Sequence, residues 1–351
     1  MKINKSEFNN LKFNLYRYII NKYSDYDIDD IQESLYQIIY YNEEAKQYIH
    51  NFLQNHKYKF VYNKIYNLEF LPVNCIEWLE LEASIYYSFK IDNINVHIIS
   101  EENIKETWFI HIKNIIKWIK DLSNKQFETL DIFLILSPYT KKINSKSDLL
   151  NFNKVNSGVT FPNENYIAIF RKEEVFKVLI HELIHYLDLD MKYSHKIKHL
   201  GDKIKTSSNH GCRQTLLNEA ITEAMAIVLH TKYYSMISNT DYVDNLKKEI
   251  KYSKLMYYLI LYHLNIKSIS DLSNFCQKTN VLAYYIFKYH ILHNSTFILN
   301  IFNKKNIENI LDKTINSLEI FDVSDIFTEY FKHNPYSFST KMSFLDLYTI
   351  I

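Results

Sequence analysis

Glycine, proline and cysteine are all scarce in this chain, which has three glycines, four prolines and three cysteines in 351 residues. The glycines are Gly158, Gly201 and Gly211, too far apart for the GxGxxG loop that binds dinucleotides. Asn, Ile, Lys and Tyr are abundant, and their codons are rich in A and T. An AT-biased genome explains this composition, so a glycine or arginine that survives the bias is expected where it is needed. All three glycines, with Arg171 and Arg213, lie between positions 158 and 213.

Other absences exclude further classes of protein. Cys75, Cys212 and Cys276 form neither a CxxC metal motif nor a disulfide framework, so we expect free thiols in a reducing compartment. The net charge is +1, without the basic surplus of a nucleic-acid-binding surface. The N-terminal segment has no signal-peptide core, and the longest apolar stretch, 255–264, is too short to span a bilayer. These features predict an intracellular, cytoplasmic protein with no nucleic-acid or membrane partner.

Hydrophobic periodicity separates helical segments from β-rich ones. Residues 1–84 have helical spacing, and 85–99 predicts a β-hairpin around Asp92 and Asn93. The other expected elements are a helix over 102–122, strands over 130–136, 158–161 and 165–170, and helices from Lys172 to Leu189 and from Arg213 to Tyr233. A polar connector is expected over 191–211, and the rest of the chain is mostly helical.

The run HELIH, residues 181–185, carries the strongest chemical signal. His181 and His185 are four residues apart, so on a helix they leave the same face and can bind one metal ion. Glu182 is rotated by about 100° from His181 and can act as general base on a water molecule that a zinc ion has acidified. Chance alone yields on the order of 0.03 such motifs in a chain of this size. The surrounding helix is apolar nearly all round, however, and buried polar groups need a partner such as a metal.

The third ligand decides the class of site. In a metzincin a glycine lies three residues after the second histidine of HExxH, and a third histidine lies three residues after that glycine. In this chain the two positions hold Asp188 and Met191, so the metzincin class is excluded. Downstream, the run NEAITE places Glu219 and Glu223 four residues apart on one helix face. An acidic pair of this kind is commonly just a solvated face. The rival ligands are three histidines of the polar connector, where exposure is the ordinary state: His195, His199 and His210.

HELIH followed by NEAITE resembles the gluzincin group of zincin metallopeptidases, and the resemblance covers about residues 85–235. The segment from SGVTF to NEAITE is also similar to metallopeptidase-like proteins of large DNA viruses. The resemblance implies one Zn²⁺ per chain held by His181, His185 and Glu219. It further implies that Glu223, with Asn218 beside it, lies in the outer shell and that Glu223 orients a ligand histidine. Glu223 stands where gluzincins often carry an Asp, and its side chain is one methylene longer.

In zincins an edge strand beside the zinc binds the substrate as an additional strand. The candidate is Val155 to Phe161, with substrate-binding residues Asn156, Ser157, Gly158 and Val159. Gly158 would permit close approach there, or is an ordinary turn glycine. Arg213 or Arg171 could hold the terminal carboxylate of a substrate, as in a carboxypeptidase, or pair internally with Glu174 or Glu219. His210 and the pair Tyr284 and Tyr285 are candidates for stabilising the oxyanion.

The sequence therefore predicts a mainly helical α+β protein with a zincin-like catalytic core and a small mixed sheet. Its expected divisions are a helical region 1–84, the core 85–235 and a helical region 236–351. The expected activity is zinc-assisted hydrolysis of a peptide or protein substrate. One alternative is a catalytically idle zincin scaffold that binds proteins, for instance in a virion, and another is hydrolysis of a non-peptide amide. The sequence leaves the oligomeric state open.

Overall fold

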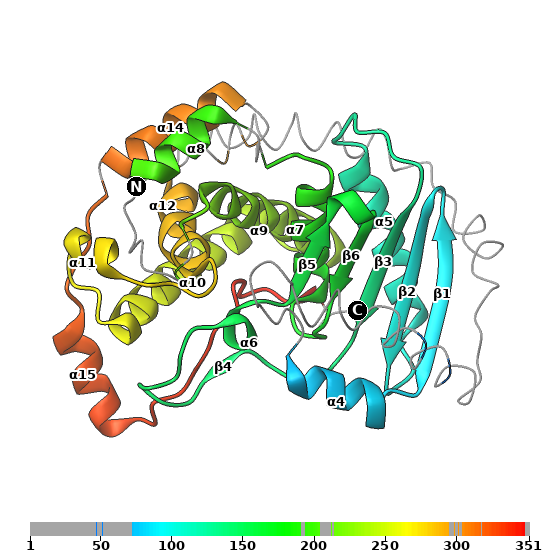
Figure 1. Ribbon diagram of the computed structural model, residues 1–351, viewed down its shortest axis with the longest axis horizontal. Helices are drawn as coiled ribbons and strands as arrows, with labels where there is room; N and C mark the ends of the chain where they lie inside the picture. Colours follow the sequence, from blue (N-terminus) through cyan, green and yellow to red (C-terminus); the bar gives the residue numbers. More distant parts are fainter. Residues whose placement is uncertain are drawn as a thin grey trace.

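The α+β prediction is confirmed by the computed structural model (Figure 1), in which a small mixed sheet is combined with many helices. The structure describes residues 72–190, 194–203, 214–294, 304–316 and 318–347, together with Gln47, Asn51, Cys212, Ile298 and Ile301. The helical expectation for residues 1–84 therefore lies outside the described residues up to position 71, apart from Gln47 and Asn51. Within the part of the chain that the structure describes, no helix is long and apolar enough to cross a bilayer.

Five strands form the main sheet in the order β1-β2-β3-β6-β5. Their bounds are β1 Ile85–Ile91, β2 Ile94–Ser100, β3 Leu130–Ile135, β5 Gly158–Phe161 and β6 Tyr166–Ile169. The predicted hairpin is confirmed, because β1 and β2 pair antiparallel around a turn in which Asp92 has a left-handed φ of 51°. Strands β2, β3 and β6 are parallel, and β5 closes one edge antiparallel to β6.

Alternating side chains give the sheet two buried faces. On β3, Ile132 and Leu134 belong to the main core, which also contains the apolar sides of α5 (Glu106–Lys120) and α7 (Val175–Tyr186). Phe133 and Ile135 point the other way and pack with α4 (Val73–Leu81). Figure 1 shows the sheet and α4 on one side of the molecule and most of the later helices on the other.

Helix α9 (Leu217–Ile237) packs along α7 and is buried over most of its length. Its other neighbours are α10 (Tyr242–Leu264), the π-helical segment η2 (Leu282–Phe287) and α12 (Lys288–His293). The remaining elements are α6 Phe152–Val155, η1 Pro162–Glu164, α8 His195–Lys203, α11 Ile269–Asn274, α14 Lys304–Asn316, α15 Ser324–His333, and the strand pair β4 Lys142–Ile143 and β7 Phe338–Ser339.

Helix α7 begins three residues later than the sequence predicts, at Val175 instead of Lys172. The cause is Glu174, which has a left-handed φ of 59° and is buried instead of lying in the first helical turn. Its carboxylate accepts hydrogen bonds from the amides of Met342 and Ser343 and pairs with Lys141. The polar connector expected over 191–211 contains a helix that the sequence analysis did not predict, α8.

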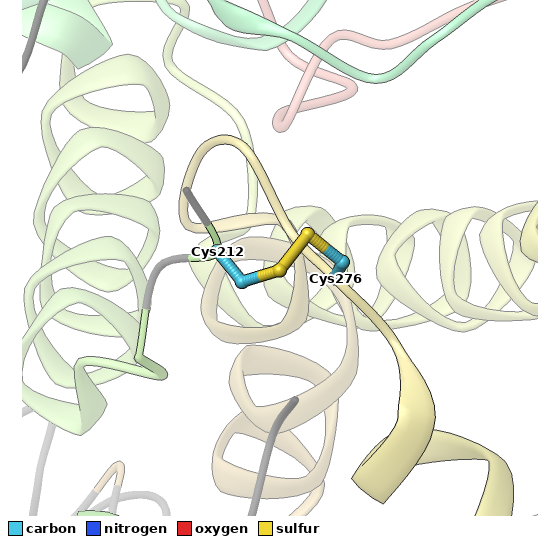
Figure 2. The surroundings of a disulfide bond; sticks show 2 residues. All are labelled: Cys212 and Cys276. Carbon is cyan, nitrogen blue, oxygen red and sulfur yellow. A yellow bond between two sulfur atoms is a disulfide. The ribbon is translucent and has the colours of Figure 1, made fainter. Parts of the chain in front are cut away.

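The expectation that the cysteines form no disulfide is wrong. Cys212 and Cys276, 64 residues apart, are joined by a disulfide bond that links the segment before α9 to the segment after α11 (Figure 2). The side chain of Gln277 donates a hydrogen bond to Thr215 beside this bond. Cys75 is a free, buried thiol. A pairing over such a distance depends on tertiary structure and leaves no local spacing signal. The argument for a reducing compartment from cysteine usage therefore no longer holds.

Replacing both bonded cysteines, as in Cys212→Ser with Cys276→Ser, is expected to lower the free energy of unfolding by about 2–4 kcal/mol, because the bond restricts a long loop in the unfolded chain. Chemical denaturation of the wild type and the double variant, with and without a dithiol reductant, measures the difference. With reductant, the free energy of unfolding of the wild type should equal that of the variant. The free energy of unfolding of the variant should be the same with and without reductant. A wild type that is equally stable in both conditions would contradict the expectation.

Candidate metal centre

The two histidines of HELIH lie one turn apart on α7 with their rings turned toward a common point. The Nε2 atoms of His181 and His185 are 3.1 Å apart, and their ring centroids are separated by 4.7 Å. Helix α7 holds them there because its apolar side chains bury it between the sheet and α9. His181 is buried and His185 is nearly so. The geometry expected from the four-residue spacing is therefore present.

Glu219 reaches the same point from the first turn of α9. Its Oε2 atom is 3.2 Å from Nε2 of His185 and 3.8 Å from Nε2 of His181. Two ligands of a tetrahedral zinc ion, each about 2.0–2.1 Å from the metal, are about 3.3 Å apart. The three observed separations lie close to that value. Among the described residues, His181, His185 and Glu219 are the group of histidine, cysteine and acidic side chains that could hold a metal ion.

Carboxylates on the far side of each ring orient the two imidazoles. Nδ1 of His181 is 2.8 Å from Oε2 of Glu223, and Nδ1 of His185 is 2.7 Å from Oδ2 of Asp190. An Nδ1–H donated to a carboxylate leaves Nε2 with its lone pair toward the centre. Two such lone pairs only 3.1 Å apart repel each other unless a cation lies between them. The donor set therefore fits a metal with nitrogen and oxygen ligands, such as zinc.

Asp190 belongs to the candidate site and was missed by sequence reasoning. Helix α7 ends at Tyr186, and Asp188 then takes a left-handed φ of 57°, so the chain turns back and Asp190 faces His185. Asn218, which was expected near the ligands, donates a hydrogen bond to Asp190 Oδ2 at 3.2 Å. Asn218 thus acts on the site through Asp190. The sequence feature that could have revealed Asp190 is its position as an acid five residues after His185, the second histidine of HELIH.

Glu182 is held against the edge strand β5. The one hydroxyl proton of Thr160 is shared between two acceptors of Glu182, its Oε2 at 2.6 Å and its backbone carbonyl at 3.1 Å, of which the carboxylate is the nearer. Along β5, Gly158 and Thr160 face α7, whereas Val159 and Phe161 pack on the opposite face. A Cβ atom on Gly158 would lie 2.7 Å from Oε1 of Glu182. The glycine therefore leaves room for the Glu182 carboxylate, whereas the close approach expected at this position was that of a substrate backbone.

If the centre hydrolyses peptides, Gly158→Ala is expected to lower kcat about 10²-fold and to leave the binding of a metal unchanged. The added methyl group would lie 2.7 Å from Oε1 of Glu182 and 2.8 Å from Cγ1 of Val178, so both side chains must shift, and the Glu182 carboxylate leaves its present position. A shift of about 1 Å in a catalytic group can cost about 10²-fold in rate. Steady-state kinetics, with metal content and thermal unfolding measured on the same samples, tests this. An unchanged kcat would show that Glu182 does not need its present position.

Tyr284 is the member of the tyrosine pair that lies at the centre. Its hydroxyl donates a 3.0 Å hydrogen bond to Oε2 of Glu219, and its ring is 6.0 Å from that of His181. The hydroxyl of Tyr285 donates instead to the carbonyl of Thr340. Burial, followed by the charges of Glu219 and Glu182, raises the pKa of Tyr284 well above its ordinary value. The phenol therefore stays protonated and can donate a hydrogen bond.

The electrostatics of the centre favour positive charge between the three ligand atoms. Burial by itself would raise the pKa of Glu219, but the neighbouring imidazoles of His185 and His181 hold it well below its ordinary value. Burial would lower the pKa of His185, yet Glu219 and Asp190 raise it well above its usual range. The surrounding carboxylates thus stabilise a proton on the imidazoles, and they would stabilise a metal cation in the same place.

The other candidate residues are placed as follows. His195 and His199 are exposed on α8, and His210 and Arg213 lie outside the described residues. Arg171 is buried, and its guanidinium donates to three backbone carbonyls, those of Tyr139, Asn153 and Asn156. These partners differ from those expected for Arg171, which were the terminal carboxylate of a substrate or an internal acid, Glu174 or Glu219.

The neighbours of Gly158 on the candidate strand have internal contacts. The side-chain oxygen of Asn156 accepts a hydrogen bond from Thr279, and the carbonyl of Ser157 accepts one from the amide of Phe170. Val159 packs on the α4 side of the sheet, away from Glu182. Gly158 is therefore the member of this group that the structure brings against the general-base candidate.

Comparison with known proteins finds a distant viral relative. An uncharacterized protein of Acanthamoeba polyphaga mimivirus is 26% identical to this chain over 215 residues. The match covers 53% of this chain and 53% of the relative, so the chain spans about half the length of the protein it matches. No family model matches the sequence.

Proposed function

We propose that this protein is a zinc-dependent peptidase of the gluzincin type. The observation that carries the proposal is the meeting of three ligand atoms, from His181, His185 and Glu219, next to the glutamate Glu182. The order of hairpin, helix, strand, edge strand, HExxH helix and glutamate helix supports it as well. The similarity to a mimivirus protein supports a viral origin.

In the proposed reaction, His181, His185 and Glu219 would hold a zinc ion. A zinc ion bound there would supply polarisation of the substrate carbonyl and a water molecule that is acidic near neutral pH. Glu182, fixed by Thr160, accepts the proton from the attacking water and passes it to the leaving amine. Tyr284 is a protonated phenol whose hydroxyl donates to Glu219 in the structure, and in the proposed reaction it would turn this hydrogen bond to the oxygen on which negative charge develops.

The edge strand β5 is the proposed support for the substrate backbone. It lies at the end of the sheet order, so its outer side has no strand neighbour within the main sheet of the described residues. An extended peptide can add to such an edge through backbone hydrogen bonds. On this strand Thr160 contacts Glu182, and Gly158 leaves room for the Glu182 carboxylate. A peptide added to the strand would therefore lie next to the proposed base.

Incubation with a library of unstructured peptides tests the proposed function directly. Mass spectrometry should detect cleavage by the protein as purified, loss of cleavage after treatment with a zinc chelator, and recovery when zinc is added back. Zinc binding without any cleavage would favour the idle scaffold that binds proteins. A scaffold has no evident use for a carboxylate held as Glu182 is held, which is why hydrolysis is the preferred function.

A further inference from the structure

Lys177 is a buried cation one helical turn before His181. Its side chain is only 2% exposed, and its Nζ atom lies 2.6 Å from Oε1 of Glu223, whose side chain is fully buried. The other oxygen of the same carboxylate, Oε2, is 2.8 Å from Nδ1 of His181. Glu223 on α9 is therefore held at both oxygens by two residues of α7.

This arrangement is costly if stability is its only purpose. Removing two charges from water costs several kcal/mol per ion, and buried ion pairs can often be replaced by apolar side chains without loss. Lys177 fixes the orientation of the Glu223 carboxylate, which in turn fixes the ring of His181. Groups that orient a ligand histidine in this way commonly contribute to metal affinity.

We infer that Lys177 is a positioning residue for the metal centre, acting through Glu223 on the ligand His181. The inference rests on the proposed function, because it assigns a role within the same metal site. Lys177 itself contacts neither ligand nor substrate in this role. Its contribution is to hold Oε2 of Glu223 in place as the hydrogen-bond acceptor for Nδ1 of His181, so that Nε2 faces the centre.

A second buried lysine–glutamate pair provides a matched control. Nζ of Lys141 is also 2.6 Å from a fully buried carboxylate, that of Glu174, and Lys141 is 1% exposed. The other oxygen of Glu174 accepts hydrogen bonds from the backbone amides of Met342 and Ser343 and touches no candidate ligand. The two pairs thus match in distance and burial and differ in whether they lead to the metal centre.

The test compares Lys177→Met with Lys141→Met in the full chain. Both variants leave a buried carboxylate without its lysine, so both should unfold at a lower temperature than the wild type. Competition with a chromophoric chelator then measures the zinc dissociation constant of the folded proteins. We expect Lys177→Met to weaken zinc binding by about 10–100-fold and Lys141→Met to leave it within about twofold of the wild type.

The possible failures are distinguishable. If the wild type binds no zinc, the proposed function is overturned. If the wild type and Lys177→Met bind zinc with the same dissociation constant, only the role of Lys177 is overturned. Equal weakening in both lysine variants would also overturn it, because the effect would then be one of general stability. If Lys177→Met does not fold, Lys177→Ala, which removes the donor and leaves room for water beside the Glu223 carboxylate, is measured with the same readouts and the same criteria.

Discussion

Glu182→Gln is expected to lower kcat/KM for peptide hydrolysis by about 10²–10⁴-fold, the usual contribution of a general base. Gln has nearly the shape of Glu and can still accept the hydrogen bond from Thr160, so the helix and its histidines should stay in place. It cannot take up a proton from the attacking water. The variant should therefore keep its zinc and its unfolding temperature while losing turnover, as steady-state kinetics and metal analysis on one preparation would show.

The contrast between metal content and rate makes this result specific. A loss of both zinc and activity would mean that Glu182 supports the metal site instead of the reaction. Activity within tenfold of the wild type would remove Glu182 from the mechanism. A residual rate that is insensitive to a zinc chelator would point to a contaminating peptidase.

Glu219→Ala is expected to weaken zinc binding by more than the 10–100-fold that is typical when an outer contact of a metal site is lost. The reason is that Oε2 of Glu219 is one of three protein atoms that converge at the centre. Without it, His181 and His185 alone would hold the ion. Chelator competition measures the dissociation constant, and loss of peptide cleavage at limiting zinc should accompany the change.

Two further variants show whether Glu219 is the ligand. Tyr284→Phe removes the hydrogen bond to Glu219 and leaves the carboxylate, so it should retain zinc. His210→Ala tests the rival histidine that lies outside the described residues. If His210→Ala loses zinc and Glu219→Ala keeps it, the gluzincin assignment is wrong and the third ligand is a histidine.

Local spacing, together with the resemblance to gluzincins, predicted which side chains meet at the candidate metal centre. The four-residue spacing of His181 and His185 fixes their geometry on any helix, and the same holds for Glu219 and Glu223. Both helices formed, and their packing brings the two pairs together. The hairpin and the short strands followed from alternating apolar residues and a turn pair. Periodicity and spacing are local properties, which is why these features could be predicted.

The contacts that complete the site depend on tertiary structure. Thr160 meets Glu182 only because β5 lies against α7, and Asp190 meets His185 only because the chain reverses at Asp188. Lys177 has no feature in the sequence that separates it from a surface lysine, although it is buried against Glu223. The Cys212–Cys276 bond joins segments 64 residues apart for the same kind of reason.

Elemental analysis of protein purified without chelators tests the central claim most directly. The proposed site predicts about one zinc ion per chain, and this content should fall to background in a His181→Ala, His185→Ala double variant that still folds. Zinc at background in wild-type protein produced with added zinc, or an equal zinc content in the double variant, would contradict it.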